Sequence, residues 1–156
     1  MSQGDISLRR ATVEDIDEFL EVENTVADRK VFAILPDENE ARKDALKDII
    51  KYFVYFIERD GKTVGTASYE MKSENHAYLF GVVVPPEFQR QGIARRAVEI
   101  ILEMLKDIKL IDLVVHPENE KAIGLYKALG FKQIGEPMEN YFGDGEPRIK
   151  MVLEKR

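Results

Sequence analysis

The chain has 156 residues, with 23 lysines and arginines, 29 aspartates and glutamates, a net charge of −6 and no cysteine. This length suits one buried core, and we expect residues 1–156 to form a single domain. The absence of cysteine excludes a disulfide framework, a thiolate zinc site and a cysteine nucleophile. The acidic balance argues against nonspecific nucleic-acid binding. No apolar run reaches the roughly 18 residues of a membrane span, and no signal-peptide core is visible, so we expect a cytoplasmic protein without a membrane partner.

Hydrophobic periodicity predicts an α/β chain of about seven strands and about four helices. The expected strands cover residues 6–10, 52–58, 62–71, 78–84, 110–116, 131–134 and 149–153. The expected helices cover residues 12–27, 37–51, 92–108 and 118–129. No repeat or low-complexity segment interrupts this order.

Several of these boundaries have a local chemical signal. Thr12 followed by Asp15 is typical of a capping box at the start of a helix. Asp37 is the expected N-cap of the second helix. Asp60-Gly61 between two β-rich runs predicts a tight hairpin.

The most informative stretch reads YLFGVVVPPEFQRQGIARRA, from Tyr78 to Ala97. Its β-rich start must end at Pro85-Pro86, because proline cannot donate a ladder hydrogen bond. Apolar residues recur at helical spacing from Ile93. The loop before that helix, residues 89–92, would present backbone N–H groups and the positive end of the helix dipole to an anion. The plainer interpretation is a strand-to-helix turn with one permissive glycine.

Two motifs carry a resemblance to a known family. Gln89-x-x-Gly92-x-Ala94 resembles the acyl-CoA pyrophosphate loop of the GNAT superfamily of N-acetyltransferases. NEKAIGLYKALGF, residues 119–131, resembles the second CoA-contacting helix of that family and follows at the family's order and distance. The resemblance implies a single-domain fold with a mixed, mostly antiparallel central sheet of about seven strands flanked by about four helices. It also implies acetyl-CoA as cosubstrate, coenzyme A as product and no metal.

The resemblance also assigns cofactor contacts. The backbone of residues 82–84 would pair with the pantetheine arm, and Gly81 with the two prolines makes a bulge or splay plausible there. The alternative is a buried core strand, and both can hold together. The residues implied in cofactor binding are Val82, Val83, Val84, Gln89, Arg90, Gln91, Gly92, Ile93, Ala94, Arg95, Asn119 and Tyr126.

The implied catalytic residues are Tyr126 and Tyr78. Tyr126 stands where the family carries its general-acid tyrosine, although a packed aromatic and a helix-capping Asn119 are the plainer alternatives. The family's usual base position is Val114, which cannot move a proton. Some members order a relay water with a tyrosine where Tyr78 stands, and the plainer alternative for Tyr78 is a half-buried aromatic of the strand. His116 is the rival base, although a lone histidine before proline is more often structural.

The acceptor is the least determined part. An α-amine with a pKa near 8 is about one-fifth neutral at pH 7.4, whereas a lysine amine is neutral roughly once in a thousand. A missing base therefore favours a protein or peptide N-terminus. Tyr141, in a segment similar to the tyrosine-bearing hairpin of ribosomal-protein-type N-terminal acetyltransferases, would contact that acceptor.

Two alternatives stay open. A polyamine could be attracted by the acidic residues 14–23, which could equally be a solvated helix face. A chain that has lost its base could instead be a non-catalytic acyl-CoA-binding module. The chain would act as a monomer or homodimer.

Overall fold

The computed structural model describes residues 5–26 and 38–155, whose contacts divide into two units. The first unit comprises described residues 5–26, 38–69 and 81–105, and the second comprises 70–80 and 106–155. Strands β3 and β4 each run through both units. Whether the chain acts as a single domain stays a prediction.

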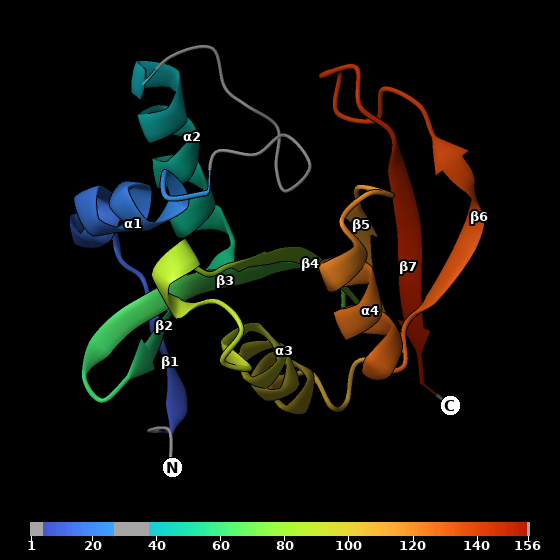
Figure 1. The fold of residues 1–156 in the computed structure, drawn as a ribbon, viewed down its shortest axis with the longest axis horizontal. Helices are drawn as coiled ribbons and strands as arrows, with labels where there is room; N and C mark the ends of the chain where they lie inside the picture. Colours follow the sequence, from blue (N-terminus) through green and yellow to red (C-terminus); the bar gives the residue numbers. More distant parts are fainter. Residues whose placement is uncertain (1–4, 27–37, 156) are drawn as a thin grey trace. The chain divides into compact units, whose positions relative to one another are not determined.

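The first unit contains three of the four described α-helices, shown with its strands in Figure 1. Its helical segments are the 3₁₀ turn η1 (Val13–Asp15), α1 (Ile16–Glu23), α2 (Glu38–Lys51), the 3₁₀ turn η2 (Pro86–Phe88) and α3 (Ile93–Met104). Its strands are β1 (Ile6–Arg10), β2 (Phe53–Arg59), the first part of β3 (Lys62–Ser73) and the last part of β4 (His76–Val83).

The core of the first unit joins α1 and α2 to strands β1 and β2. Phe19 packs edge-on against Phe56, with ring centroids 6.4 Å apart. Ile16, Ala45 and Ile49 are buried in the same cluster. Burying such aliphatic and aromatic side chains stabilises the fold by about 1.5–3 kcal/mol each.

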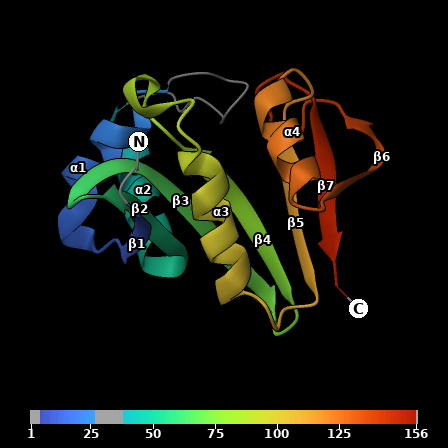
Figure 2. The same ribbon diagram turned by 60° about the horizontal axis from the view of Figure 1, so that its bottom comes forward.

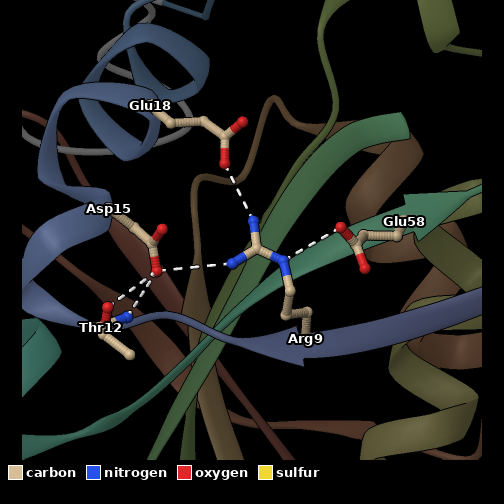
Figure 3. A network of polar contacts seen from close by, with 5 residues as sticks. All are labelled: Arg9, Thr12, Asp15, Glu18 and Glu58. Atoms are coloured by element: carbon tan, nitrogen blue, oxygen red, sulfur yellow. Dashed lines mark hydrogen bonds and ion pairs between the residues drawn. The ribbon is translucent and has the colours of Figure 1, made fainter. Parts of the chain in front are cut away.

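Arg9 links β1, the start of α1 and β2, as Figure 3 shows. Its Nε donates to Glu58 Oε2 at 3.0 Å, and its Nη2 donates to Glu18 Oε1 at 3.0 Å. Asp15 Oδ2 lies 3.5 Å from Nη1 and also accepts the Thr12 backbone N–H at 2.8 Å. The predicted capping box is therefore present, and Arg9 ties it to the sheet.

The second unit contains the rest of the sheet and α4. Its elements are the end of β3, the start of β4, β5 (Leu110–Val115), α4 (Glu120–Ala128), β6 (Lys132–Met138) and β7 (Arg148–Glu154). Both views place α4 beside β5 and β7 (Figures 1 and 2). Ile111, Leu113, Phe131 and Met151 are buried in this unit.

The described residues form one seven-stranded sheet in the order β1-β2-β3-β4-β5-β7-β6. The β1–β2, β2–β3, β5–β7 and β6–β7 pairs are antiparallel, and β4–β5 is parallel. The β4–β5 register joins residues 76–78 to residues 110–112, and both strands continue beyond it. The expected α/β class with a mixed, mostly antiparallel sheet is confirmed.

The main differences from the predicted elements lie at helix ends and at the end of β6, which runs to Met138 and not to the expected Ile134. The first helix begins as a 3₁₀ turn and ends at Glu23, before the expected end at Ala27, which lies outside the described residues. Asp37, the expected N-cap of α2, also lies outside them. The third helix ends at Met104, four residues earlier than the apolar spacing to Ile108 suggests. Asp60 and Gly61 have φ of 54° and 75°, so the hairpin turn is confirmed.

The acidic residues 14–23 are used largely in packing and ion pairs. Asp15 and Glu18 contact Arg9, and Asp17 pairs with Arg42 at 2.6 Å. This supports a structural role for much of the acidic run. No described helix has both the length and the apolar character required to traverse a lipid bilayer.

Glu23 is the exception, because its Oε2 is buried without a hydrogen-bond partner in the described part of the chain. Burial, with a smaller contribution from Asp48, raises the pKa of Glu23 from 4.5 to about 7. Between these values the unfolded chain has lost the proton that the folded chain still holds. The free energy of unfolding therefore falls as pH rises through that interval, by about 3 kcal/mol in all.

We predict that Glu23→Gln removes this pH dependence, because the amide stays neutral. The variant should be more stable than wild type by up to about 3 kcal/mol near pH 8, and nearly equal to it near pH 4. Urea unfolding at both pH values measures the difference. Glu21→Gln, at an exposed position of the same helix, is the control. A gain of equal size at both pH values would contradict the prediction.

Candidate functional site

The predicted anion loop follows β4, which ends at Val83 just before the two prolines. Gly92 is the N-cap of α3 and has a φ of 75°, a left-handed conformation that glycine adopts without strain. A Cβ placed there would meet nothing within 4 Å. Ile93, Ala94 and Arg95 form the first turn of α3, where backbone N–H groups have no intrahelical partner. The loop therefore presents an open helix N-terminus suited to an anion.

Two kinds of side chain occur in this loop: glutamines that hydrogen-bond to neighbouring protein groups, and arginines. Gln89 Nε2 donates to the Val84 carbonyl at 2.9 Å, and Gln91 Oε1 accepts from Arg59 Nη1 at 2.6 Å. Both glutamines thus hold the loop itself, and their predicted ligand contacts would be through the backbone. Arg90 is exposed with a φ of 65°. Arg95 shares Glu99 with Arg96, which lowers the net positive charge of this helix start.

The β4 segment assigned to pantetheine has an irregular backbone. Gly81 has a φ of 136°, which interrupts the strand alternation, and Val83 and Val84 are both buried beyond it. Before Gly81, Tyr78 and Phe80 contact each other edge-on, with ring centroids 5.3 Å apart.

Gly65 is a residue of this region that the sequence analysis missed. A Cβ at Gly65 would lie 2.5 Å from the Val83 carbonyl oxygen, closer than real side chains approach. Glycine is required there so that β3 can pack closely against the β4 backbone. The only sequence signal is a glycine inside a strand pattern.

The second unit holds the other predicted residues, beginning with Asn119 and Tyr126. Asn119 is the N-cap of α4, and its Oδ1 accepts the Ala122 N–H at 3.3 Å. Tyr126 is 5% exposed and packs edge-on against Phe131 at 5.5 Å. Burial raises the pKa of Tyr126 to about 12, so the phenol keeps its proton at neutral pH. That state is the one a general acid requires.

Tyr78 is the centre of a group of polar side chains. Burial first, and then the neighbouring Tyr141, Asp112, Glu70 and Tyr126, raise the pKa of Tyr78 above its ordinary value. The structure thus brings together the three tyrosines that the sequence proposed. It adds two carboxylates that the sequence analysis did not consider. A Tyr78 that stays protonated can donate a hydrogen bond to water or a carbonyl but cannot itself remove a proton.

The two carboxylates differ in their surroundings. Asp112 is 5% exposed and pairs with His76 at 2.7 Å and Lys150 at 3.5 Å. The Glu70 side chain is 16% exposed and pairs with Lys72 at 3.0 Å. Glu70 is therefore more accessible to a ligand than Asp112. In the sequence, the one signal for Glu70 is its position near the end of an expected strand.

His116 does not have the geometry of a base. Its ring is 3% exposed, and Nδ1 accepts the Glu118 backbone N–H at 3.0 Å. In the neutral ring the proton is therefore on Nε2, which lies 3.6 Å from Glu146 Oε1. Neither nitrogen then has a lone pair available to an amine, which weighs against the rival base.

A cavity of about 550 Å³ also lies in the first unit, between α1, the β2–β3 turn and η2. Arg9, Glu58, Lys62, Glu87 and Phe88 are among its lining residues. None of the predicted site residues lines it. In the described ranges, no group of three or more histidine and carboxylate side chains could hold a metal ion.

Residues 14–131 match the model of the Acetyltransferase (GNAT) family. The chain belongs to this family. Both motifs of the sequence analysis fall within the matched residues, so the resemblance on which the expectations rested is confirmed.

Two curated GNAT relatives act on different amines. A spermidine N(1)-acetyltransferase from Escherichia coli is 33% identical over 107 residues, which are 64% of this chain and 56% of that enzyme. The chain thus spans little more than half of that relative. A ribosomal protein bS18-alanine N-acetyltransferase from Escherichia coli is 31% identical over 105 residues, which are 66% of this chain and 70% of that enzyme.

A solved structure shows the GNAT fold over almost the whole chain. It is the PaiA N-acetyltransferase from Thermoplasma acidophilum in complex with coenzyme A, 19% identical, with a TM-score of 0.75. The match covers 97% of this chain and 99% of that chain. The fold expected from the two motifs is therefore confirmed.

We predict that Gly92→Val weakens coenzyme A binding by more than about tenfold, because a branched side chain would occupy the open space at the helix N-terminus. Gly61→Val is a matched control, since Gly61 has the same φ of 75° and the same empty surroundings in a hairpin turn. Both variants carry similar backbone strain, about 1–3 kcal/mol. Calorimetric titration with coenzyme A measures the affinities. Equal affinities for the two variants would contradict the assignment of the loop.

Proposed function

We propose that this protein transfers the acetyl group of acetyl-CoA directly to a primary amine, and that this amine is a protein or peptide N-terminus. The observation that carries the proposal is the group of Tyr78, Tyr126 and Tyr141 in the second unit. Membership of the GNAT family and the coenzyme A complex of a structural relative support acetyl-CoA as the cosubstrate. The cofactor residues of the proposal are those of the α3 loop, residues 82–84, Asn119 and Tyr126.

The chain's own groups would divide the chemistry as follows. The amine nitrogen attacks the thioester carbonyl, and the carbon–sulfur bond breaks with the electron pair going to sulfur. Tyr126, which holds its proton at neutral pH, would protonate the leaving thiolate. Tyr78 would donate a hydrogen bond that orients a water, and that water would receive the proton lost by the amine. Tyr141 would position the acceptor.

The choice of an N-terminus rests on proton chemistry and on one relative. Valine stands at position 114, and the Nδ1 lone pair of His116 accepts the Glu118 N–H while Nε2 carries the ring proton, so no strong base is available at the positions the family uses. An α-amine needs the least help, because its pKa is about 8. The bS18-alanine N-acetyltransferase, of which the match covers 70%, acts on such an amine.

A polyamine is the second candidate acceptor, and the carboxylates favour it. Glu70 and Asp112 both lie within electrostatic reach of Tyr78, where they would attract an ammonium group. The spermidine N(1)-acetyltransferase relative, which acts on a polyamine, supports this candidate. Asp112 already contacts His76 and Lys150, however, so Glu70 carries most of the argument.

Acceptor identity is predicted to appear in the pH profile of turnover. With the best peptide N-terminus, kcat/KM should rise through about pH 7–8.5 and then flatten, because deprotonating an α-amine is the main requirement. With spermidine, kcat/KM should keep rising above about pH 9. A turnover screen over peptide N-termini, lysine peptides and polyamines identifies the best acceptor. No turnover with any amine would favour a non-catalytic acyl-CoA-binding module.

Tyr126→Phe is predicted to lower kcat by about 10²–10⁴-fold, the usual contribution of a general acid. Acetyl-CoA affinity should change little, because the proton is needed only as the thioester breaks. Stopped-flow turnover and calorimetric titration separate the two quantities. Tyr52→Phe, in the core cluster of the first unit, is the control. If Tyr126→Phe weakens binding as much as it lowers kcat, the tyrosine is a binding residue only.

A further inference from the structure

Arg148 is a buried charged residue that the proposed chemistry does not use. It is the first residue of β7 and is 1% exposed. A buried guanidinium is costly unless its donors are satisfied, so its partners indicate what it holds in place. Its partners among the described residues include members of the loop between β6 and β7, residues 139–147, called here the Tyr141 loop.

The guanidinium contacts the Tyr141 loop at three points. Nη2 donates to Asp144 Oδ2 at 3.3 Å, and Nη1 donates to the Pro147 carbonyl at 2.9 Å. Its central carbon lies 5.1 Å from the centroid of the Phe142 ring, a cation–π distance. Only arginine offers planar donors in two directions together with a flat face for an aromatic ring.

The loop adds its own bonds to this anchor. Asp144 Oδ1 accepts the Glu146 N–H at 3.0 Å, and Asn140 Oδ1 accepts the Gly145 N–H at 2.6 Å. Asn140 has a φ of 49°, a left-handed conformation that asparagine tolerates better than most residues. Asp144 thus joins the buried guanidinium to the turn of the loop.

Tyr141 lies on the loop that Arg148 contacts. Tyr141 is 44% exposed and rests edge-on against Phe142, with ring centroids 4.8 Å apart. Phe142 in turn lies over Arg148. The chain of contacts therefore runs from the buried guanidinium through Phe142 to an accessible phenol, on the loop that the proposed function assigns to the acceptor.

We propose that Arg148 is a positioning residue for the amine acceptor, which it serves by fixing the Tyr141 loop through Asp144 and Phe142. The inference rests on the proposed function, because it concerns how the acceptor is held. It assigns a role in holding the acceptor to a residue that is itself buried.

The test uses Asp144→Asn and Arg148→Lys, with steady-state kinetics on the best acceptor from the amine screen. Asp144→Asn keeps the shape of the side chain and removes its charge, whereas Arg148→Lys keeps the charge and removes the planar fork. Each should raise the acceptor KM by about tenfold while acetyl-CoA affinity and kcat change less than about twofold. Asp17→Asn, which breaks the exposed ion pair with Arg42, is the control and should change none of these.

Coupling to Tyr141 separates positioning from general destabilisation. If Arg148 acts through Tyr141, adding Asp144→Asn to Tyr141→Phe should raise KM no further than Tyr141→Phe alone. Hydrogen exchange of the Gly145 and Glu146 amides should speed up in Asp144→Asn, while exchange in β5 stays unchanged. Asp144→Asn carries the test should Arg148→Lys fail to fold.

Three results would overturn the inference. These are an unchanged acceptor KM in both variants, KM effects that multiply with Tyr141→Phe, or an equal loss of acetyl-CoA affinity. In each of them the wild type still acetylates an amine, so the proposed function survives. Absence of turnover in the wild type would instead overturn the proposed function, and the positioning role with it.

Discussion

The parallel pairing of β4 with β5 is the constraint on which much of the fold depends. Parallel neighbours cannot be joined by a hairpin, so the chain needs a crossover connection, and α3 supplies it. The chain passes from the end of β4 at Val83 through η2 to the start of α3 at Ile93. Pro85 and Pro86 end the strand, and Gly92 opens the helix. The helix N-terminus that we propose as the anion site thus lies near the end of β4 as a result of the topology.

The ionisable groups around Tyr78 differ from those of an enzyme that relies on one strong base. Tyr78 and Tyr126 both hold their protons more firmly than a tyrosine in water, because burial disfavours the phenolate. Both are therefore hydrogen-bond donors at neutral pH. A site of this kind is suited to stabilising a leaving group and ordering water. In the proposed function, deprotonation of the amine would fall largely to the solvent, which would limit the amines that the site uses efficiently.

The sequence predicted elements better than it predicted side-chain roles. The Asp60-Gly61 turn and the proline stop after Val83 are local rules, and local rules leave a sequence signal. Gly65 matters through a carbonyl oxygen on another strand, and no local pattern reports that distance. Gln89 shows the same limit, because its place in the motif suggested a ligand while its side chain braces the loop. Asp112 and Glu70 were overlooked because strand neighbours depend on register, which sequence alone does not determine.

The ultraviolet absorbance of tyrosine offers a way to follow ionisation in this protein. Three of the six tyrosines, Tyr69, Tyr78 and Tyr126, have raised pKa values, and the chain contains no tryptophan. Its near-ultraviolet absorbance therefore comes from tyrosine, with a small phenylalanine contribution. Phenolate formation shifts tyrosine absorbance to longer wavelength. An alkaline titration would therefore follow the ionisation of the tyrosines with raised pKa values without any label. A ligand that covered Tyr78 would then change the pH dependence of this ultraviolet absorbance.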